Sequence, residues 1–165
     1  EKLKILRNIL NVLASETFSA VSAPIQYAAI KAYDGNHDKY IEISKNILKA
    51  IGNFVYENLN SNKILINKPH GGFYLMPEFI SKRFSTSSEM CNEILKQTGV
   101  ALLPGSDFGF DKKKLIVRLS FTDFNGENFM NNYENNSNIN DEMIKKFAPR
   151  IVEGVQKLKK WSETI

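Results

Sequence analysis

The side chain with the clearest chemical potential in this sequence is Arg118. It lies in the middle of a segment from Leu115 to Phe121 whose apolar residues alternate as they do in a β-strand. A charged side chain in such a strand is costly to remove from water unless it meets an anion. Because the planar guanidinium suits a carboxylate in bidentate geometry, one interpretation is a site for a carboxylate ligand. A solvated sheet face and an ion pair with a structural carboxylate are the alternatives, and the strand pattern leaves all three open.

Two histidines and one cysteine are the other residues that could act as a base, a nucleophile or a metal ligand. His37 follows a turn, His70 precedes a pair of glycines, and Cys91 lies in a predicted helix among core positions. None of them has the spacing of a zinc motif, so we expect no metal site. A Cys–His nucleophile pair is an alternative, and the simpler prediction is two surface histidines and a buried thiol.

The glycines around Gly105 and Gly109 do not form a nucleotide-binding loop. The run GSDFG matches neither the dinucleotide nor the P-loop pattern, and Lys112 is not followed by Ser or Thr. This segment therefore predicts a tight turn.

Three helices are expected before the first strand. Apolar residues at helical spacing predict a helix over roughly residues 2–13. Ser22 is a candidate N-cap for a second helix that runs to about Tyr33, with a proline in its first turn. The third and longest helix runs from about Tyr40 to the Asn58–Asn62 region.

The second half of the chain alternates short strands with helices. Thr86 and Glu89 form a capping box that begins a helix, and Gly99 ends it. A final helical region is interrupted by Pro149, which predicts either a kink or a short helix followed by a longer one that begins at this proline. The asparagine-rich residues 125–140 are predicted to form a loop. Strands are predicted at 64–66, 73–76, 100–103 (a buried strand) and 115–121.

Composition places the chain among globular domains, and the order of predicted helices and strands makes it one continuous α/β unit. Its 165 residues, 42% of them apolar, are enough for one domain with a core, and they exclude wholesale disorder and a disulfide scaffold. The net charge of +4 is modest and scattered, and it accompanies no nucleic-acid-binding motif, so we expect no nucleic-acid partner. No apolar run approaches the ~20 residues that span a bilayer, and we expect no membrane association. A single cysteine fits a reducing compartment, which favours a cytoplasmic location.

Four segments, in this order, resemble one family. They are SAPIQYAA (22–29), PHGGFYL (69–75), GVALLPGSDFG (99–109) and VRLSF (117–121). The first is similar to the helix that follows the cofactor lysine in class I/II pyridoxal-phosphate aminotransferases, and the other three resemble a strand entry, a loop and a strand of the same enzymes. Each motif is weak alone, and together they cover nearly the whole chain.

The resemblance implies a fold and two site residues. Residues 1–165 would be the small C-terminal domain of such an enzyme, with a small antiparallel or mixed sheet covered by helices and with residues 1–14 as an interdomain helix. Arg118 would bind the α-carboxylate of the amino-acid or 2-oxo-acid substrate, and Phe73 would line the substrate side of the site. The segment 15–22 resembles one near the dimer interface. The implied partners are the chain's own large cofactor domain and a second subunit in a homodimer.

The resemblance also implies what this chain lacks. The family's Schiff-base lysine, the aspartate beside the pyridine nitrogen, the tyrosine and the phosphate cup all precede the matched region. No lysine here has the family's Ser-x-x-Lys context, so we expect no catalytic, cofactor-binding or metal-binding residue, no binding of pyridoxal 5'-phosphate by this chain alone, and no activity on its own. We interpret the start at Glu1 as a domain boundary. The alternative is a free-standing, non-catalytic interaction module that kept the fold. Aspartate, alanine, aromatic amino acids and kynurenine all stay open as substrates.

Overall fold

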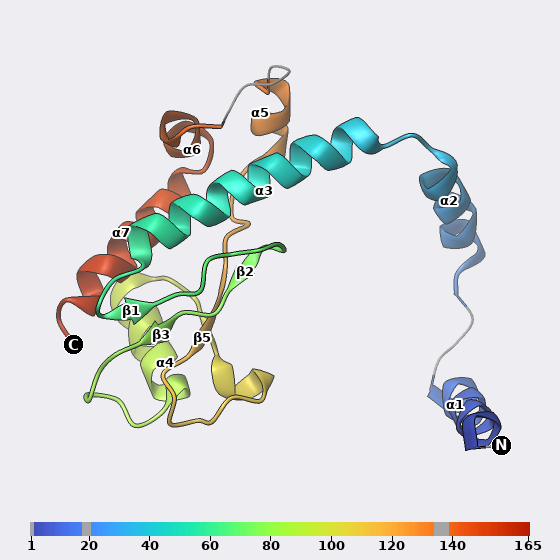
Figure 1. The fold of residues 1–165 in the computed structure, drawn as a ribbon, viewed down its shortest axis with the longest axis horizontal. Coiled ribbons are helices and arrows are strands. Elements are labelled where there is room, and N and C mark those ends of the chain that lie inside the picture. The colour runs from blue at the N-terminus through green and yellow to red at the C-terminus, as the bar shows by residue number, and fades with distance from the viewer. Residues whose placement is uncertain (1, 18–20, 134–138) are drawn as a thin grey trace. The chain divides into compact units, whose positions relative to one another are not determined.

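The computed structural model describes residues 2–17, 21–133 and 139–165 (Figure 1). The chain divides into two compact units, unit 1 (Glu1–Asp38) and unit 2 (Lys39–Ile165). Each unit is described by itself.

Unit 1 contains the first two predicted helices, α1 (Lys2–Thr17) and α2 (Ala23–Asp34). The helix predicted over 2–13 is confirmed and extends four residues further. Ser22 precedes α2 as predicted, but its side chain makes no capping hydrogen bond; its carbonyl accepts from the Gln26 N–H at 3.1 Å. No described side chain of α1 or α2 is buried, so the apolar faces of these helices have no core within the described residues.

Unit 2 is built on a small antiparallel sheet. The central strand β5 pairs on one flank with β2 and on the other with β4. Strands β1 and β3 form a second antiparallel pair, which a bridge between Glu78 and Ile116 joins to the segment entering β5. This arrangement confirms the predicted small antiparallel sheet. The strands are β1 (Ile64–Leu65), β2 (Tyr74–Leu75), β3 (Glu78–Phe79), β4 (Leu103–Pro104) and β5 (Val117–Ser120).

The prediction of a buried strand over 100–103 is wrong in two respects. First, hydrogen-bonded strand pairing is limited to Leu103 and Pro104. Second, the side chains of Ala101 and Leu103 are exposed. Only Leu102 is buried, because β4 is an edge strand and a strand directs alternate side chains to opposite faces. The exposed Leu103 is the register partner of Arg118.

Helix α4 (Ser87–Thr98) begins and ends where its capping residues predict. The Glu89 N–H donates to Thr86 Oγ1 at 3.2 Å, and the Glu89 carboxylate accepts from the Ser85 N–H at 3.0 Å. Gly99 ends the helix with φ of 75°, and its N–H donates to the Leu95 carbonyl at 2.9 Å. The predicted start and stop of this helix are confirmed.

The prediction of a loop over 125–140 needs correction, because α5 (Gly126–Asn131) lies within it. Asparagine disfavours helix interiors but favours N-caps, and Asn125 caps α5 by accepting from the Asn128 N–H at 3.3 Å. Phe129 then anchors the short helix, because its side chain is fully buried against two other phenylalanines. Residues 134–138 lie outside the described residues.

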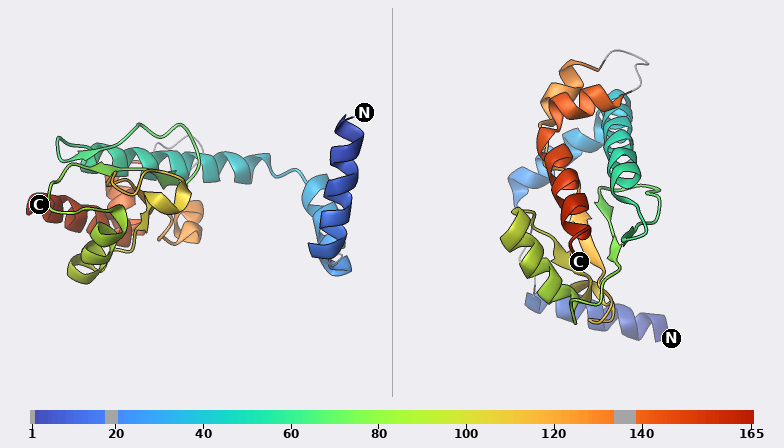
Figure 2. Two further views of the ribbon diagram at one scale, coloured as in Figure 1. Left: turned by 90° about the horizontal axis from the view of Figure 1, so that it is seen from below. Right: turned by 90° about the vertical axis from the view of Figure 1, so that its left-hand side faces the viewer.

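The C-terminal region follows the second alternative at Pro149. A short helix, α6 (Asp141–Phe147), precedes the longer α7 (Pro149–Ser162), and Ala148 is buried at the junction. Figures 1 and 2 show α7 beside α4. The Trp161 indole N–H donates to Gln97 Oε1 at 2.7 Å and so joins these two helices.

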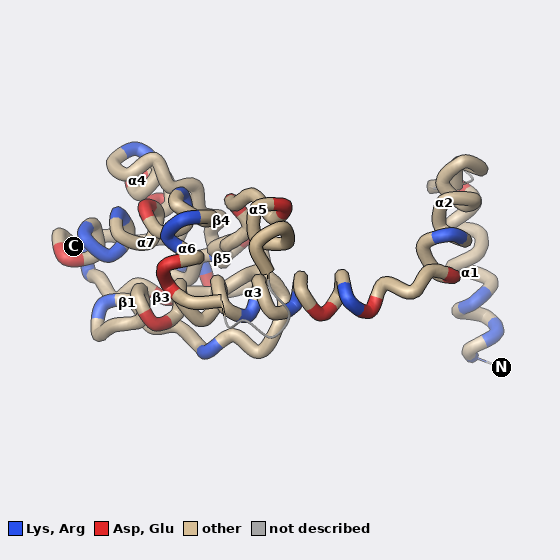
Figure 3. Tube along the Cα trace, turned by 90° about the horizontal axis from the view of Figure 1, so that it is seen from above, with Lys and Arg blue, Asp and Glu red and all other residues tan. Residues whose placement is uncertain are grey.

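One apolar core holds these elements together. The long helix α3 (Asp38–Leu59) buries one face, and β5, α4 and α7 contribute to the same cluster. Acidic and basic residues interleave along the part of α3 outside the core (Figure 3). No helix in the described ranges is both long and apolar enough to cross a membrane.

Candidate functional site

Arg118 lies on β5, on the face opposite the core. Its neighbours Val117 and Leu119 are 0% and 6% exposed, so strand alternation directs the arginine to the other side of the sheet. The side chain is half-buried there.

Two aromatic rings contact the guanidinium of Arg118. Its Cζ lies 4.5 Å from the centre of the Tyr74 ring and 4.4 Å from that of the Phe108 ring. Tyr74 is the register partner of Ser120, which makes it the diagonal neighbour of Arg118 on the same face. Phe108 ends the 3₁₀ turn η1 (Gly105–Phe108), which directly follows β4. One ring therefore comes from a strand that flanks β5, and the other from the turn that follows the strand on the opposite flank.

Two glycines place Phe108 over the sheet. The Gly105 N–H donates to the Ile116 carbonyl at 2.8 Å, and a Cβ at Gly105 would lie only 2.8 Å from that same oxygen. Gly109 ends the turn with φ of 87°, a conformation that other residues seldom adopt. The predicted tight turn is confirmed: Gly105 allows a close backbone approach, and Gly109 allows the left-handed conformation that ends the turn.

Arg118 has no protein anion as its partner among the described residues. The ion pairs in these ranges join Arg83 to Glu93, Arg150 to Asp123 and Lys157 to Glu153. No side-chain hydrogen bond of Arg118 is formed there either. Of the three interpretations, an ion pair with a structural carboxylate therefore has no candidate in the described ranges. Arg118 is half-buried as a residue, and a solvated sheet face and a carboxylate ligand are the two interpretations that stay open.

Phe73 lies next to this cluster. Its ring centre is 4.3 Å from that of Tyr74, and its backbone carbonyl accepts from the Phe121 N–H at 3.2 Å. The side chain is 39% exposed. Phe73 thus contacts the neighbouring ring that lies over Arg118, and a substrate role for Phe73 stays a prediction.

The sequence analysis singled out neither Tyr74 nor Phe108 as a site residue. Strand alternation could have indicated Tyr74, once the register of β2 against β5 was known. No local signal indicates Phe108, because its approach depends on how the turn after β4 folds back over the sheet.

The two histidines and the cysteine do not form a nucleophilic site. His37 and His70 are exposed, whereas Cys91 is 5% exposed. Burial, with a smaller contribution from the Asp107 carboxylate, raises the pKa of the Cys91 thiol to about 11. A thiol with so high a pKa is a poor nucleophile at neutral pH. The prediction of surface histidines and a buried thiol is confirmed.

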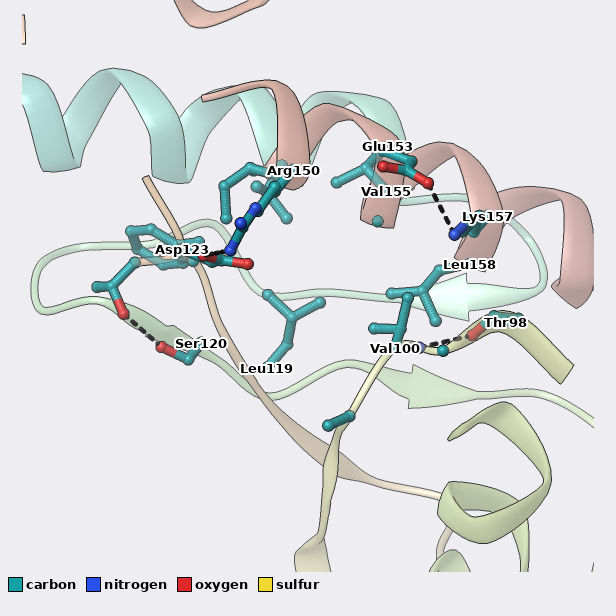
Figure 4. A pocket seen from close by; sticks show the side chains of 17 residues that line it. Thr98, Val100, Leu119, Ser120, Asp123, Arg150, Glu153, Val155, Lys157 and Leu158 are labelled. Atoms are coloured by element: carbon teal, nitrogen blue, oxygen red, sulfur yellow. Dashed lines mark hydrogen bonds and ion pairs between the residues drawn. The ribbon is translucent and has the colours of Figure 1, made fainter. Parts of the chain in front are cut away.

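A cavity of about 590 Å³ opens on the other side of β5 (Figure 4). Its walls come from α7, the end of β5 and the connection between α4 and β4, with Leu119, Val155 and Leu158 among its apolar residues. The ion pairs Arg150–Asp123 (3.4 Å) and Lys157–Glu153 (2.8 Å) lie along it. Neither Arg118 nor Phe73 lines this cavity.

The lysines of the described residues are exposed, with one exception. A lysine that forms a Schiff base with a cofactor needs a desolvated position or a cationic neighbour that lowers its pKa. All the lysines in the described ranges are exposed except Lys63, which is half-buried and donates from Nζ to the Ile165 carbonyl at 3.1 Å.

Comparison with known proteins identifies the family. A model of the family described as aminotransferase class I and II matches residues 4–130. An aspartate aminotransferase from Bacillus sp. (strain YM-2) is 33% identical over 119 residues, which are 69% of this chain and 29% of that protein. An asparagine–oxo-acid transaminase from Streptococcus mutans is 32% identical over 117 residues, which are 68% of this chain and 29% of that protein.

Solved structures agree with the sequence relatives. An aspartate aminotransferase from Thermotoga maritima matches 90% of this chain and 31% of its own, with a TM-score of 0.59 and 26% identity. An alanine aminotransferase from Pyrococcus furiosus matches the whole chain and 36% of its own, with a TM-score of 0.67 and 22% identity, a likeness of fold. The chain spans about a third or less of each of these proteins. It belongs to the class I and II aminotransferase family.

Proposed function

We propose that this member of the family is the small C-terminal domain of a pyridoxal-phosphate-dependent aminotransferase, and that Arg118 binds the substrate α-carboxylate. The enzyme would transfer an amino group between an amino acid and a 2-oxo acid. Both substrates carry a carboxylate next to the reacting carbon, so one fixed cation serves both halves of the reaction.

The observation that carries this proposal is the state of Arg118. Arg118 is half-buried as a residue, two aromatic rings contact its guanidinium, and it has no ion-pair partner within the described ranges. Partial burial of a charge is costly unless an anion compensates it. A planar carboxylate that accepts two parallel N–H bonds is the anion that best matches a guanidinium.

The remaining parts of the enzyme would come from outside this chain. Because the described lysines other than Lys63 are exposed, we assign the cofactor to a large domain of the same polypeptide. The apolar faces of α1 and α2, which bury no described side chain, support packing of unit 1 on further polypeptide. On this proposal residues 1–14 form an interdomain helix, and the full enzyme is a cytoplasmic homodimer.

The chemistry divides between the two domains. When bound, pyridoxal phosphate supplies the electron sink for the bond that breaks at the substrate Cα. This chain would hold the substrate carboxylate on Arg118. That contact would fix the orientation of the other bonds at the substrate Cα. Phe73, beside the same cluster, would exclude water from the substrate side.

The test is Arg118→Lys in the complete polypeptide encoded by the gene. Lysine keeps the charge but loses the fork, so we expect a loss of about 1.5–3 kcal/mol in kcat/KM, the strength of a hydrogen bond to a charged group. L-aspartate and L-asparagine, each with 2-oxoglutarate, are the first substrates to assay. Arg83→Lys is the matched control, because Arg83 also lies over a phenylalanine but is paired with Glu93.

Unchanged kinetics of the Arg118→Lys enzyme would refute the carboxylate role. The 165-residue chain alone should show neither transaminase turnover nor the visible absorbance of a cofactor–lysine adduct, and either signal would contradict the assignment of the cofactor to another domain. A reading frame that begins at or just before Glu1 would favour an interaction module instead.

A further inference from the structure

We infer that Tyr74 and Phe108 are positioning residues that hold the Arg118 guanidinium ready to receive a carboxylate. This inference rests on the proposed function of Arg118. It assigns a role to two aromatic residues that the strand pattern around Arg118 does not indicate.

The first argument is the origin of the two rings. In the order β2-β5-β4, Tyr74 belongs to the strand on one flank of Arg118. Phe108 belongs to the turn that follows the strand on the other flank. With ring centres 4.5 Å and 4.4 Å from Cζ, the guanidinium is contacted by rings from two elements, and each element is joined to β5 by strand pairing or directly follows a strand that is.

The second argument is what these contacts leave free. An aromatic ring attracts a cation through its negatively charged face and offers the N–H groups no lone pair in return. A carboxylate side chain at position 74 or 108 would instead accept hydrogen bonds from the N–H groups of Arg118. The two rings therefore stabilise the position of the charge while its N–H edge stays open to a ligand.

The third argument is the exposure of the rings. Tyr74 and Phe108 are each 42% exposed, so neither is a core residue whose ring is needed to fill the interior. An arginine side chain has many rotamers, and holding it in one of them before the ligand arrives reduces the entropy lost on binding. The cluster is thus a preorganised binding group.

The functional test is a double-mutant cycle in the complete polypeptide, with L-aspartate and 2-oxoglutarate as substrates, or L-asparagine if that is the better donor. Tyr74→Leu and Phe108→Leu should each raise KM for the amino acid about 3- to 10-fold, the loss expected for a half-buried cation–π contact, with a smaller effect on kcat. Tyr74→Phe and Phe108→Tyr keep the rings and should restore KM. Phe110→Leu is the matched control, because Phe110 is 41% exposed on the same segment.

The same leucine substitutions should change kcat/KM less than twofold when Arg118 is already alanine. Full additivity would show that the rings act on the substrate directly, and it would overturn the inference. Leucine variants with unchanged KM would overturn it as well.

A second measurement separates this inference from the proposed function. In the 165-residue chain, the NMR signal of the Arg118 Nε–Hε group should carry a ring-current shift that either leucine substitution reduces and the Phe110→Leu control retains. Absence of that shift refutes the contact of the rings with Arg118. If the shift is present but Arg118→Lys leaves the kinetics of the full enzyme unchanged, the carboxylate role is refuted and with it the positioning of a substrate-binding group.

Discussion

Replacement of Gly105 by alanine tests the close approach that places Phe108 over Arg118. A Cβ at this position would lie 2.8 Å from the Ile116 carbonyl oxygen and 3.1 Å from the Ile116 Cβ. The oxygen belongs to the backbone and also accepts the Gly105 N–H, so it cannot move away without weakening that bond. The substitution must therefore separate the turn from the segment that enters β5.

The cost follows from two contributions. Forcing an added methyl into a packed site costs about 1–3 kcal/mol, and weakening the hydrogen bond costs up to about 1 kcal/mol more. Alanine also restricts the unfolded chain, which returns about 0.4–1 kcal/mol to the folded state. We expect a net loss of about 2 kcal/mol in the free energy of unfolding, near the middle of the range that these contributions span.

Urea unfolding of the 165-residue chain, followed by the fluorescence of Trp161, measures this loss. With a typical slope of about 2 kcal/mol per molar urea, the midpoint should fall by about 1 M. Gly154→Ala is the control, because a Cβ there meets only Val100 Cγ2 at 4.0 Å, and alanine is favoured over glycine inside a helix by about 1 kcal/mol. A Gly105→Ala midpoint equal to that of the unmodified chain would refute the close approach and the account of how Phe108 is placed.

Two further predictions concern α4. Thr86→Ala removes the N-cap that accepts from the Glu89 N–H and should cost about 1 kcal/mol in urea unfolding, whereas Ser88→Ala, on the exposed first turn, should change stability by less than about 0.5 kcal/mol; equal effects would contradict the capping assignment. Since the folded state holds the pKa of the Cys91 thiol at about 11, the unfolded state loses its proton first, and stability should fall as pH rises from the ordinary thiol pKa towards 11. Each pH unit in that window corresponds to about 1.4 kcal/mol, and Cys91→Ala should remove the decrease; a slope that persists in the variant would contradict this assignment.

The local elements of this protein could be predicted because their signals are local. The caps of α4 are Thr86 and Gly99, and both act within one helical turn of the residues that they bond. The break before α7 follows from Pro149, whose ring cannot continue a helix from the preceding turn. The alternation of apolar residues around Arg118 likewise predicted β5, whose arginine side chain points away from the core.

The sequence prediction failed in two segments where residues of one type have different environments in the structure. Asparagines predicted a loop over 125–140, yet Asn125 and Asn140 each cap a helix, and the burial of Phe129 decides that α5 forms. The apolar run 100–103 predicted a buried strand, but its position at the sheet edge leaves Leu103 exposed opposite Arg118. In both cases the position of the segment in the tertiary structure outweighed local composition.

The sequence by itself determined the helices other than α5, the strand that carries Arg118, the family resemblance and the choice of Arg118 as the candidate site residue. Only the tertiary structure decided what surrounds that side chain. Tyr74 reaches it through the register of β2 against β5, and Phe108 reaches it through a turn that Gly105 holds against the backbone at Ile116. The physical reason is that a cation–π contact depends on the distance between a charge and a ring, and residues 74, 108 and 118 become neighbours only when three separate segments pack together.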